Sequence, residues 1–381
     1  MANTIAALLH GRDNNFNLIR FLAASAVILD HSFALVAHDQ AAALPVDVES
    51  LEIGKVAVDV FFIISGFLVT RSVVTQPTLV DYGVARFLRR FPGLFVATVF
   101  IAFVLGPLVT LVSWQEYFSD PRPWLFVPLT ASLITHTLTL PGVFDAVPES
   151  GVIDPPLWTL RYESMCYVLL AIFAGLGMLA TRGRAALTLA LIFGGYVFVT
   201  FTTSLRGNIS AIDSLARFVL CFFVGGALYL FADRIRLGLG VALLLGLAAV
   251  AAYGTPVFEM AYKLALGYGL IWFALVPAGP IRRFNLIGDY SYGLYILCVP
   301  ILQSFVMLDP AITLGALFVC SFPAVLALAV LSWHFVEHPA LMRKAWAGDC
   351  VGSLLHGVRE RLAASFKSGA AAKALKVREA R

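Results

Sequence analysis

The chain has 381 residues, of which 60% are apolar and only 13% are charged, and its formal net charge is +4. Soluble domains carry about 25% charged residues, so this composition excludes an ordinary soluble globule, and it also excludes a disordered chain. The net charge is too small to indicate a nucleic-acid partner. The composition predicts an all-α, polytopic membrane protein.

Apolar segments long enough to cross a bilayer recur along the chain. A spanning helix needs about 20 mainly apolar residues. The sequence therefore predicts about ten spans, at roughly 17–37, 55–71, 93–113, 158–180, 185–203, 213–231, 236–253, 260–277, 286–307 and 311–335. A further stretch at 124–140 is interrupted by prolines, and we expect it to be re-entrant or interfacial.

The basic residues indicate an orientation in the membrane. With ten spans, most of the 27 lysines and arginines fall on one side, together with the whole C-terminal tail. Because Lys and Arg are enriched in cytoplasmic loops, both termini are predicted to be cytoplasmic, in the cell (inner) membrane. Counting 124–140 as a span would place Arg282, Arg283 and the tail outside, which this charge bias argues against.

The chain divides into one membrane domain and a short tail. The membrane domain is predicted over 14–343 and a basic cytoplasmic tail over 344–381. Apolar residues recur at helical spacing in this tail, at Leu354, Leu355, Val358 and Leu362. This pattern predicts an amphipathic helix on the inner leaflet, although a solvated tail fits equally well beyond Lys367. The five cysteines occur singly, so no disulfide framework and no metal site is expected.

The first span carries a histidine and an arginine on one face. Arg20 and His31 are eleven residues apart, which is close to three helical turns and about 16 Å along the axis. A histidine can accept a proton near neutral pH, so His31 is a candidate general base. A structural histidine bonded to another helix fits the same spacing.

The second span contains the segment VDVFFIISGFLV at 58–69, with Asp59 inside the apolar run. Ser65 and Gly66 permit close approach of another helix. No GxSxG elbow surrounds Ser65, so a structural role for this serine is favoured over a nucleophilic one.

Three arginines precede the third predicted span. Arg86, Arg89 and Arg90 stand at positions i, i+3 and i+4 and share one helix face. Guanidinium groups bind phosphate oxygens bidentately, so this face suits a phosphorylated ligand. Chemistry alone favours the alternative, in which the arginines anchor the helix at the inner surface or bind anionic lipid.

The remaining polar positions lie in the fourth span and near the last two. Glu163 enters its span from the outside, and we expect it at about the depth of His31, where it could orient the histidine; an ion pair with some other helix is the alternative. Tyr292 and Tyr295 are expected to be interfacial anchors. Glu337 and Pro339 follow the last span.

Taken together, these segments resemble the integral-membrane acyltransferase-3 family, whose members resemble bacterial O-acetyltransferases of polysaccharides. The resemblance runs in order from about residue 14 to 343 and rests on six motifs. These are Arg20 and His31 of an Arg-x10-His, 58–67 of GVDlFFvlSGF, Arg86, Arg89 and Pro92 of an RxxR before a proline, Trp158, Glu163 and Tyr167 of WSLxxExxxY, Ser291, Tyr292 and Tyr295 of LGxxSYxxYLxH, and Glu337 and Pro339 of ExP. Each motif is weak alone, but six in order are specific.

The resemblance implies an O-acyltransferase with no permanently bound cofactor. Acyl-CoA, usually acetyl-CoA, would be the co-substrate and would approach from the cytoplasm, with its phosphates held by Arg20, Arg86, Arg89 and Arg90. His31 would act as general base on an acceptor hydroxyl or as a relay, and Glu163 would orient it. The acceptor would be an extracytoplasmic or lipid-linked saccharide. Supporting roles fall on Asp59, Ser65, Trp158, Ser291, Tyr292 and Glu337.

Two departures from the family pattern matter. Cys298 stands where the family often has a histidine. Some relatives also carry an extracytoplasmic domain after the last span, whereas only a short basic tail follows here. A second transfer step would therefore need a separate extracytoplasmic partner enzyme.

A transporter or exporter of a sugar or lipid is the competing interpretation, because ten spans with intramembrane charges suit it equally well. Transporters often contain inverted repeats and helices broken at the middle of the membrane. The sequence has no detectable repeat, and its polar groups cluster towards the two faces. These features favour the enzyme.

Overall fold

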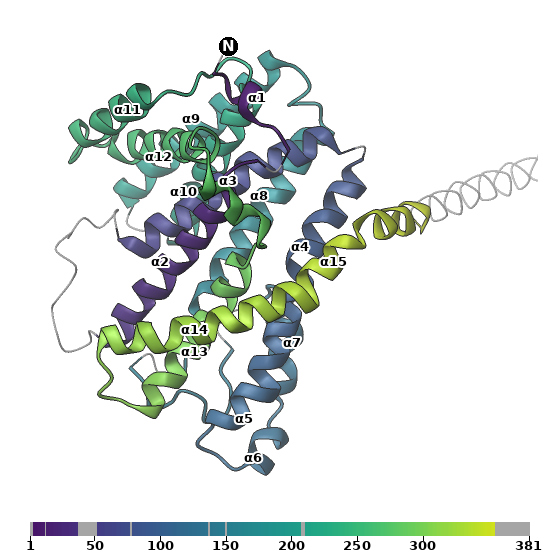
Figure 1. The fold of residues 1–381 in the computed structure, drawn as a ribbon, viewed down its shortest axis with the longest axis vertical. Coiled ribbons are helices and arrows are strands. Elements are labelled where there is room, and N and C mark those ends of the chain that lie inside the picture. Colours follow the sequence, from purple (N-terminus) through teal and green to yellow (C-terminus); the bar gives the residue numbers. More distant parts are fainter. Residues whose placement is uncertain are drawn as a thin grey trace, which may run out of the picture.

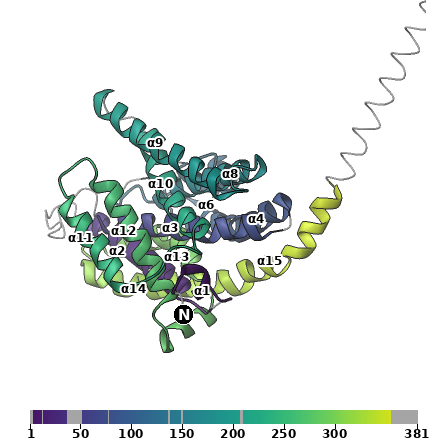
Figure 2. The same ribbon diagram turned by 90° about the horizontal axis from the view of Figure 1, so that it is seen from above.

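The computed structural model describes residues 3–11, 13–36, 52–76, 78–135, 138–148, 151–206 and 210–354. Over these residues the chain is a bundle of helices with two isolated β-bridges and no strand. Figures 1 and 2 show the bundle from two directions. The predicted all-α membrane bundle is therefore confirmed.

Each of the ten predicted spans corresponds to a helix. The helices are α2 (Phe16–Val36), α3 (Ile53–Thr75), α4 (Leu79–Phe100), α8 (Trp158–Gly175), α9 (Arg182–Arg206), α10 (Ser210–Leu230), α11 (Leu239–Ala251), α12 (Phe258–Leu275), α13 (Ser291–Leu308) and α14 (Leu314–Ser332). In the described part of the chain, eight helical segments are long and apolar enough to span a membrane. Counting α12 with η4 (Pro280–Leu286), to which it is bent by 93°, gives nine. Only α11, with 13 residues, is shorter than a span.

Helix α3 lies at the centre of the bundle because glycines let α10 approach it closely. A Cβ on Gly66 would lie 1.8 Å from the Phe222 carbonyl oxygen, and one on Gly225 would lie 1.9 Å from the Ile63 carbonyl oxygen. Small residues permit this kind of backbone contact between membrane helices. In Figure 2, α3 lies between α10 and α2. Gly66 therefore has the packing role that the sequence predicted for the Ser65–Gly66 pair.

We expect Gly225→Ala to destabilise the protein by about 1–3 kcal/mol or more, because the new methyl group must push α3 and α10 apart. Gly194→Ala in α9 is the matched control, since a Cβ there meets nothing within 4 Å. Size-exclusion chromatography of heated samples in detergent would compare the two variants. Equal melting of the two variants would contradict a tight α3–α10 contact.

Helices α2 and α3 run antiparallel, and their contacts set the depth of each residue. The Gly54 amide donates to Asp30 Oδ1 at 3.0 Å near one end of the pair. The rings of Phe16 and Phe67 are 5.6 Å apart near the other end. By this register Arg20 lies level with the middle of α3, whereas His31 lies level with its first turn.

The chain that leads into α8 is buried in the bundle. Val143, Phe144 and Ile153 are at most 2% exposed. Gln303 Nε2 donates to the Val152 carbonyl at 2.8 Å, and the Tyr295 hydroxyl donates to the Pro156 carbonyl at 3.0 Å. Helix α8 therefore begins inside the bundle rather than at its surface. Before this segment, α7 (Arg122–Ala131) has ten residues and is too short to span, as the sequence predicted for the 124–140 stretch.

The third span begins earlier than the hydropathy suggests. Helix α4 begins at Leu79, where the Thr78 hydroxyl caps the Asp81 amide at 3.1 Å, and continues through Pro92 into η2 (Ile101–Leu105) and α5 (Gly106–Val109). The helix therefore begins before Arg86, Arg89 and Arg90, whereas the apolar part of the segment follows them, as the sequence predicted. They lie within helix α4, where carboxylates from distant parts of the chain pair with Arg89 and Arg90.

The residues that follow α14, as far as 354, continue that helix across α4. Helix α14 passes through η5 (Trp333–Glu337) into α15 (His338–Met342), and residues 344–354 are helical after a turn at Arg343. Residues 355–381, with most of the predicted amphipathic pattern, lie outside the described residues. The cytoplasmic position of the two termini stays a prediction.

Candidate active site

A cavity lies where α2, α3, α4, α8 and α13 meet, with about 530 Å³ of empty space including its open mouth. Ser65, which lines it, stands near the middle of α3. The polar residues of its lining are Arg20, Ser65, Arg89, Arg90, Thr159, Glu163, Tyr167, Ser291, Tyr292 and Tyr295. Most of the motif residues found in the sequence therefore converge on one site.

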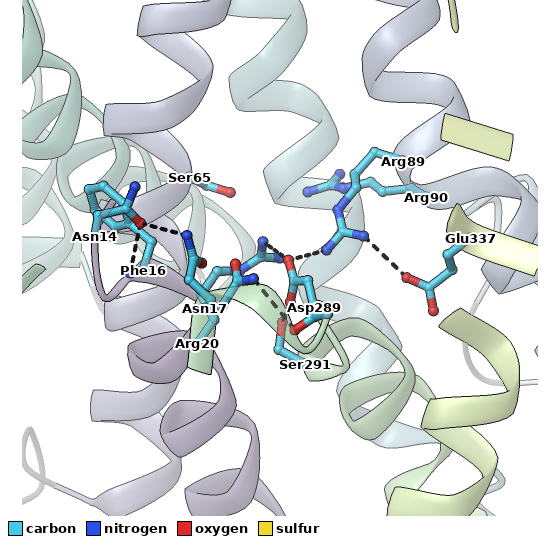
Figure 3. A network of polar contacts seen from close by, with 12 residues as sticks. Asn14, Phe16, Asn17, Arg20, Ser65, Arg89, Arg90, Asp289, Ser291 and Glu337 are labelled. Atoms are coloured by element: carbon cyan, nitrogen blue, oxygen red, sulfur yellow. Dashed lines mark hydrogen bonds and ion pairs between the residues drawn. The ribbon is translucent and has the colours of Figure 1, made fainter. Parts of the chain in front are cut away.

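One side of the cavity is organised by Asp289, whose side chain is only 10% exposed. Its Oδ2 atom accepts from Arg20 Nη1 and from Arg89 Nη2, each at 2.5 Å (Figure 3). The Ser291 hydroxyl donates to the other carboxylate oxygen at 2.5 Å. Asp289 therefore ties α2 and α4 to the start of α13.

The same arginine reaches a second carboxylate from the end of the bundle. Arg89 Nη1 lies 3.2 Å from Glu337 Oε2, and Glu337 is fully buried. The Ser332 hydroxyl donates to the other Glu337 oxygen at 2.9 Å. Figure 3 shows Arg89 between Asp289 and Glu337. This pairing joins the helix that follows α14 to α4.

The other side of the cavity is organised by Arg90 and Glu163, which form an ion pair. Arg90 also donates to the Ser164 hydroxyl at 3.1 Å and to the Tyr167 hydroxyl at 2.9 Å. Its guanidinium carbon lies 4.2 Å from the centre of the Tyr167 ring. Glu163 Oε1 accepts from the Tyr167 hydroxyl at 2.6 Å and from Ser65 Oγ.

The charges of this network balance. Arg20, Arg89 and Arg90 are paired with three carboxylates, those of Asp289, Glu337 and Glu163. A buried charge without a partner costs several kcal/mol, so the pairing makes three arginines tolerable deep in the bundle. Because each guanidinium has five N–H donors, some remain available to a bound molecule.

The Ser65 hydroxyl faces the cavity rather than its own helix. Several serines in these helices donate to the carbonyl four residues earlier, namely Ser25, Ser32, Ser164 and Ser304. Ser65 instead donates to Glu163 and lies 3.4 Å from the Tyr167 hydroxyl. Contact of the neighbouring Gly66 with α10 fixes this orientation. Ser65 therefore contributes to the polar surface of the site, whereas Gly66 makes the helix contact.

His31 is not among the residues that line the cavity. Eleven residues separate it from Arg20 on α2, a distance of about 16 Å along the helix. Glu163 contacts Ser65 at the level of Arg20, so the prediction that Glu163 lies at the depth of His31 is wrong. The buried chain before α8 accounts for the difference, because it carries the start of that helix below the surface of the bundle.

Four sequence candidates lie beside the cavity rather than on it. Asp59 pairs with Arg217 at 3.0 Å on the α10 side of α3. Trp158 packs against Tyr162 and Phe218. Arg86 lies 5.9 Å from the centre of the Tyr167 ring but does not line the cavity. Cys298 is buried, and its thiol donates to the Tyr295 carbonyl at 3.2 Å.

Two tyrosines have roles different from the interfacial anchors that the sequence predicted. The Tyr292 hydroxyl donates to the Arg90 carbonyl at 3.0 Å, which joins α13 to α4. The Tyr295 hydroxyl lies 2.6 Å from Thr159 Oγ1, which joins α13 to α8. Both residues line the cavity, so they set its walls.

Sequence reasoning missed Asp289, although a signal was present. The residue stands in GDYSYG, directly before an apolar span. Ionisable side chains at such positions are functional candidates by default. The motif match drew attention to Ser291 and Tyr292 and passed over the carboxylate that organises the arginines.

Comparison with known proteins agrees with the motifs. The sequence profile of a family described as an acyltransferase domain, acyltransferase-3, matches residues 13–334. The chain is 25% identical to an O-acetyl transferase of Shigella phage Sf6, over 88% of this chain and 98% of the relative. It is 27% identical to Nodulation protein 10 of Rhizobium leguminosarum bv. viciae, over 87% and 94%.

A third relative is the exopolysaccharide production protein ExoZ of Rhizobium meliloti strain 1021, which is 30% identical over 76% of this chain and 88% of its own length. No solved structure gives a significant match. The family profile covers most of the chain, and the motifs that carry it surround one polar cavity within a bundle of membrane helices. The chain therefore belongs to the acyltransferase-3 family and is an integral-membrane acyltransferase.

Proposed function

We propose that this enzyme, in the cell (inner) membrane, moves an acetyl group from cytoplasmic acetyl-CoA to a hydroxyl of an extracytoplasmic or lipid-linked saccharide. The observation that carries the proposal is the cavity in which Ser65, Glu163 and three arginines meet. Relatives named O-acetyl transferase and exopolysaccharide production protein support the acyl group and the acceptor class. A later transfer step would fall to a separate extracytoplasmic enzyme.

The cavity has the groups that acyl transfer requires. Developing negative charge on a thioester carbonyl is stabilised by preorganised donors, and Arg20, Arg89 and Arg90 surround the space. Glu163 is the carboxylate that can orient a hydroxyl or accept its proton, since Ser65 and Tyr167 already donate to it. Glu163 therefore acts in the cavity itself.

His31 serves the acceptor side as general base or relay. It is not among the residues that line the cavity, and it lies about 16 Å along α2 from Arg20. From that end of α2 it would act on a hydroxyl that arrives from the other membrane face. Because the hydroxyl must reach the thioester carbonyl itself, either the acceptor or the acyl end of the donor would have to extend over the roughly 16 Å between these two levels.

A hollow on the outside of the bundle supports a lipid-linked acceptor. It is lined mainly by apolar side chains of α8 and α10, including Met165, Val168 and Val219. Ser164 lies in its wall and accepts a hydrogen bond from Arg90 of the cavity. An apolar lipid tail could lie in this hollow with its saccharide near the site.

Transfer of label tests the proposal. Membranes with the wild-type protein and labelled acetyl-CoA should yield labelled glycolipid or polysaccharide. Glu163→Gln should lower transfer about 100-fold or more, because an amide neither accepts the proton nor balances Arg90. Glu116→Gln is the matched control, since Glu116 is an exposed carboxylate on α6 (Trp114–Ser119).

Two results would count against this function. If the folded wild-type protein transferred no label to supplied saccharide acceptors, acetyl-CoA would not be the donor. Undiminished transfer by Glu163→Gln would show that Glu163 is not needed for the reaction.

The competing interpretation, a transporter, loses its basis because the chain belongs to an acyltransferase family.

A further inference from the structure

Ser65 is the hydroxyl-bearing residue of α3 that lines the cavity. Its neighbours Ile64 and Gly66 are buried, whereas Ser65 itself is partly exposed. The sequence favoured a structural role for this serine, but the close contact with α10 is made by Gly66. The Ser65 hydroxyl donates instead to Glu163, a carboxylate of α8. A serine that donates to a carboxylate in an accessible cavity has the arrangement of a nucleophile with its base.

Most other hydroxyls of the cavity have different hydrogen-bond partners. The Ser291 hydroxyl is fully buried and donates to Asp289, which already accepts from two arginines. Tyr292 donates to a backbone carbonyl. The hydroxyls of Thr159 and Tyr295 lie 2.6 Å apart, and both bond one backbone carbonyl. Among the described residues that line the cavity there is no cysteine and no histidine.

Ser65 and Tyr167 are the two cavity hydroxyls that donate to Glu163. They differ in their contact with Arg90. This guanidinium donates to the Tyr167 hydroxyl at 2.9 Å and lies over its ring. The bond occupies a lone pair of the tyrosine oxygen and makes it a poorer nucleophile. Ser65 is therefore the hydroxyl that the geometry favours for attack on an acyl group.

We propose that Ser65 carries the acetyl group as a covalent ester between a donor and an acceptor half-reaction. This inference rests on the proposed function, which supplies acetyl-CoA and the saccharide. In the first half, Glu163 takes the proton of Ser65 and Ser65 Oγ attacks the thioester carbonyl. The carbon–sulfur bond breaks, and CoA leaves as the thiolate, which takes a proton from water.

In the second half, the acceptor hydroxyl attacks the ester carbonyl and the bond from that carbon to Ser65 Oγ breaks. The base on the acceptor side takes the proton of the hydroxyl, and Glu163 returns its proton to Ser65 Oγ. The enzyme is then restored, and the acetyl group has moved from sulfur to the saccharide oxygen.

Two half-reactions suit the single cavity and its charges. CoA leaves before the saccharide arrives, so the two large substrates need not occupy the cavity together. Arg90 supports the first half because it is paired with Glu163. While Glu163 holds the proton, the guanidinium lacks its counter-charge and can stabilise negative charge on the acyl oxygen.

Exchange of label between CoA and acetyl-CoA, with purified full-length protein and no acceptor, tests the inference. Formation of an acetyl-enzyme is reversible, so labelled CoA should enter the acetyl-CoA pool, and peptide mass spectra should show an acetyl group on Ser65. Ser65→Ala should lose both signals and lower transfer to a saccharide about 10³-fold or more. Ser304→Ala is the matched control, since the Ser304 hydroxyl donates to its own helix.

Ser65→Cys distinguishes a nucleophile from a structural serine. This variant should also become acetylated at position 65, as a thioester that neutral hydroxylamine cleaves, whereas the ester of the wild type should survive this treatment. A structural role would leave both proteins without label. Because this comparison uses the wild type and Ser65→Cys, it decides the question even if Ser65→Ala does not fold.

The outcomes separate this inference from the proposed function. Transfer to a saccharide without exchange and without protein-bound acetyl would overturn the acetyl-serine and leave acetyl-CoA as the donor, with direct attack by the acceptor. An acetyl group on Tyr167 or His31 in place of Ser65 would also overturn it. Absence of both exchange and transfer in the folded wild type would overturn both proposals.

Discussion

Asp289→Asn is expected to destabilise the protein by about 3–5 kcal/mol, because it leaves two arginines deep in the bundle without their shared counter-charge. The carboxylate now accepts from Arg20 and Arg89, and all three side chains are at most 22% exposed. The amide keeps the shape of the side chain but not its charge. Thermal unfolding of the protein in detergent would measure the loss.

Asp233→Asn is the matched control. Asp233 pairs with Arg182 at the same distance of 2.5 Å, but both side chains are about half exposed. An exposed pair contributes at most about 1 kcal/mol, so this variant should melt close to the wild type. Removing Arg20 together with Asp289 should recover part of the loss, because fewer charges are then left unpaired. Equal melting of the two single variants would show that the Asp289 network does not hold α2, α4 and α13 together.

Much of the fold follows from hydropathy alone, since the cost of exposing backbone groups to lipid leaves few alternatives to helices. The motifs also found most of the site. Ser65, the neighbouring Arg89 and Arg90, and Glu163 come from three separate helices yet meet around one cavity. These residues could be predicted because each motif specifies which positions of one helix carry the polar side chains.

The depth of those residues could not be predicted in the same way. A hydropathy window treats Arg86, Arg89 and Arg90 as an obstacle to a span, because the carboxylates that balance Arg89 and Arg90 come from distant parts of the chain. Similarly, the chain with Phe144 and Ile153 is buried, so α8 begins inside the bundle. The sequence near these residues carries no sign of this burial. The partner of a charge and the path of a loop are tertiary properties.

His31→Ala is expected to lower acetyl transfer by about 10²–10⁴-fold, the usual contribution of a general acid or base. The protein should still fold, because His31 lies about three turns along α2 from Arg20 and its side chain is not among the residues that line the cavity. Labelled acetyl transfer, with thermal unfolding of the same preparation, measures both effects. His10→Ala is the control, since His10 is exposed and precedes α2.

The binding of CoA decides which half of the reaction His31 serves. If it acts on the acceptor, the Ala variant should bind CoA as the wild type does and fail only in transfer. Weaker CoA binding would instead assign His31 to the donor site, against the distance between His31 and the arginines. Normal transfer by the variant would mean that the base on the acceptor side lies elsewhere. Glu163 would then be the remaining candidate for both proton steps, because it is the carboxylate that faces the cavity beside Ser65 and Tyr167.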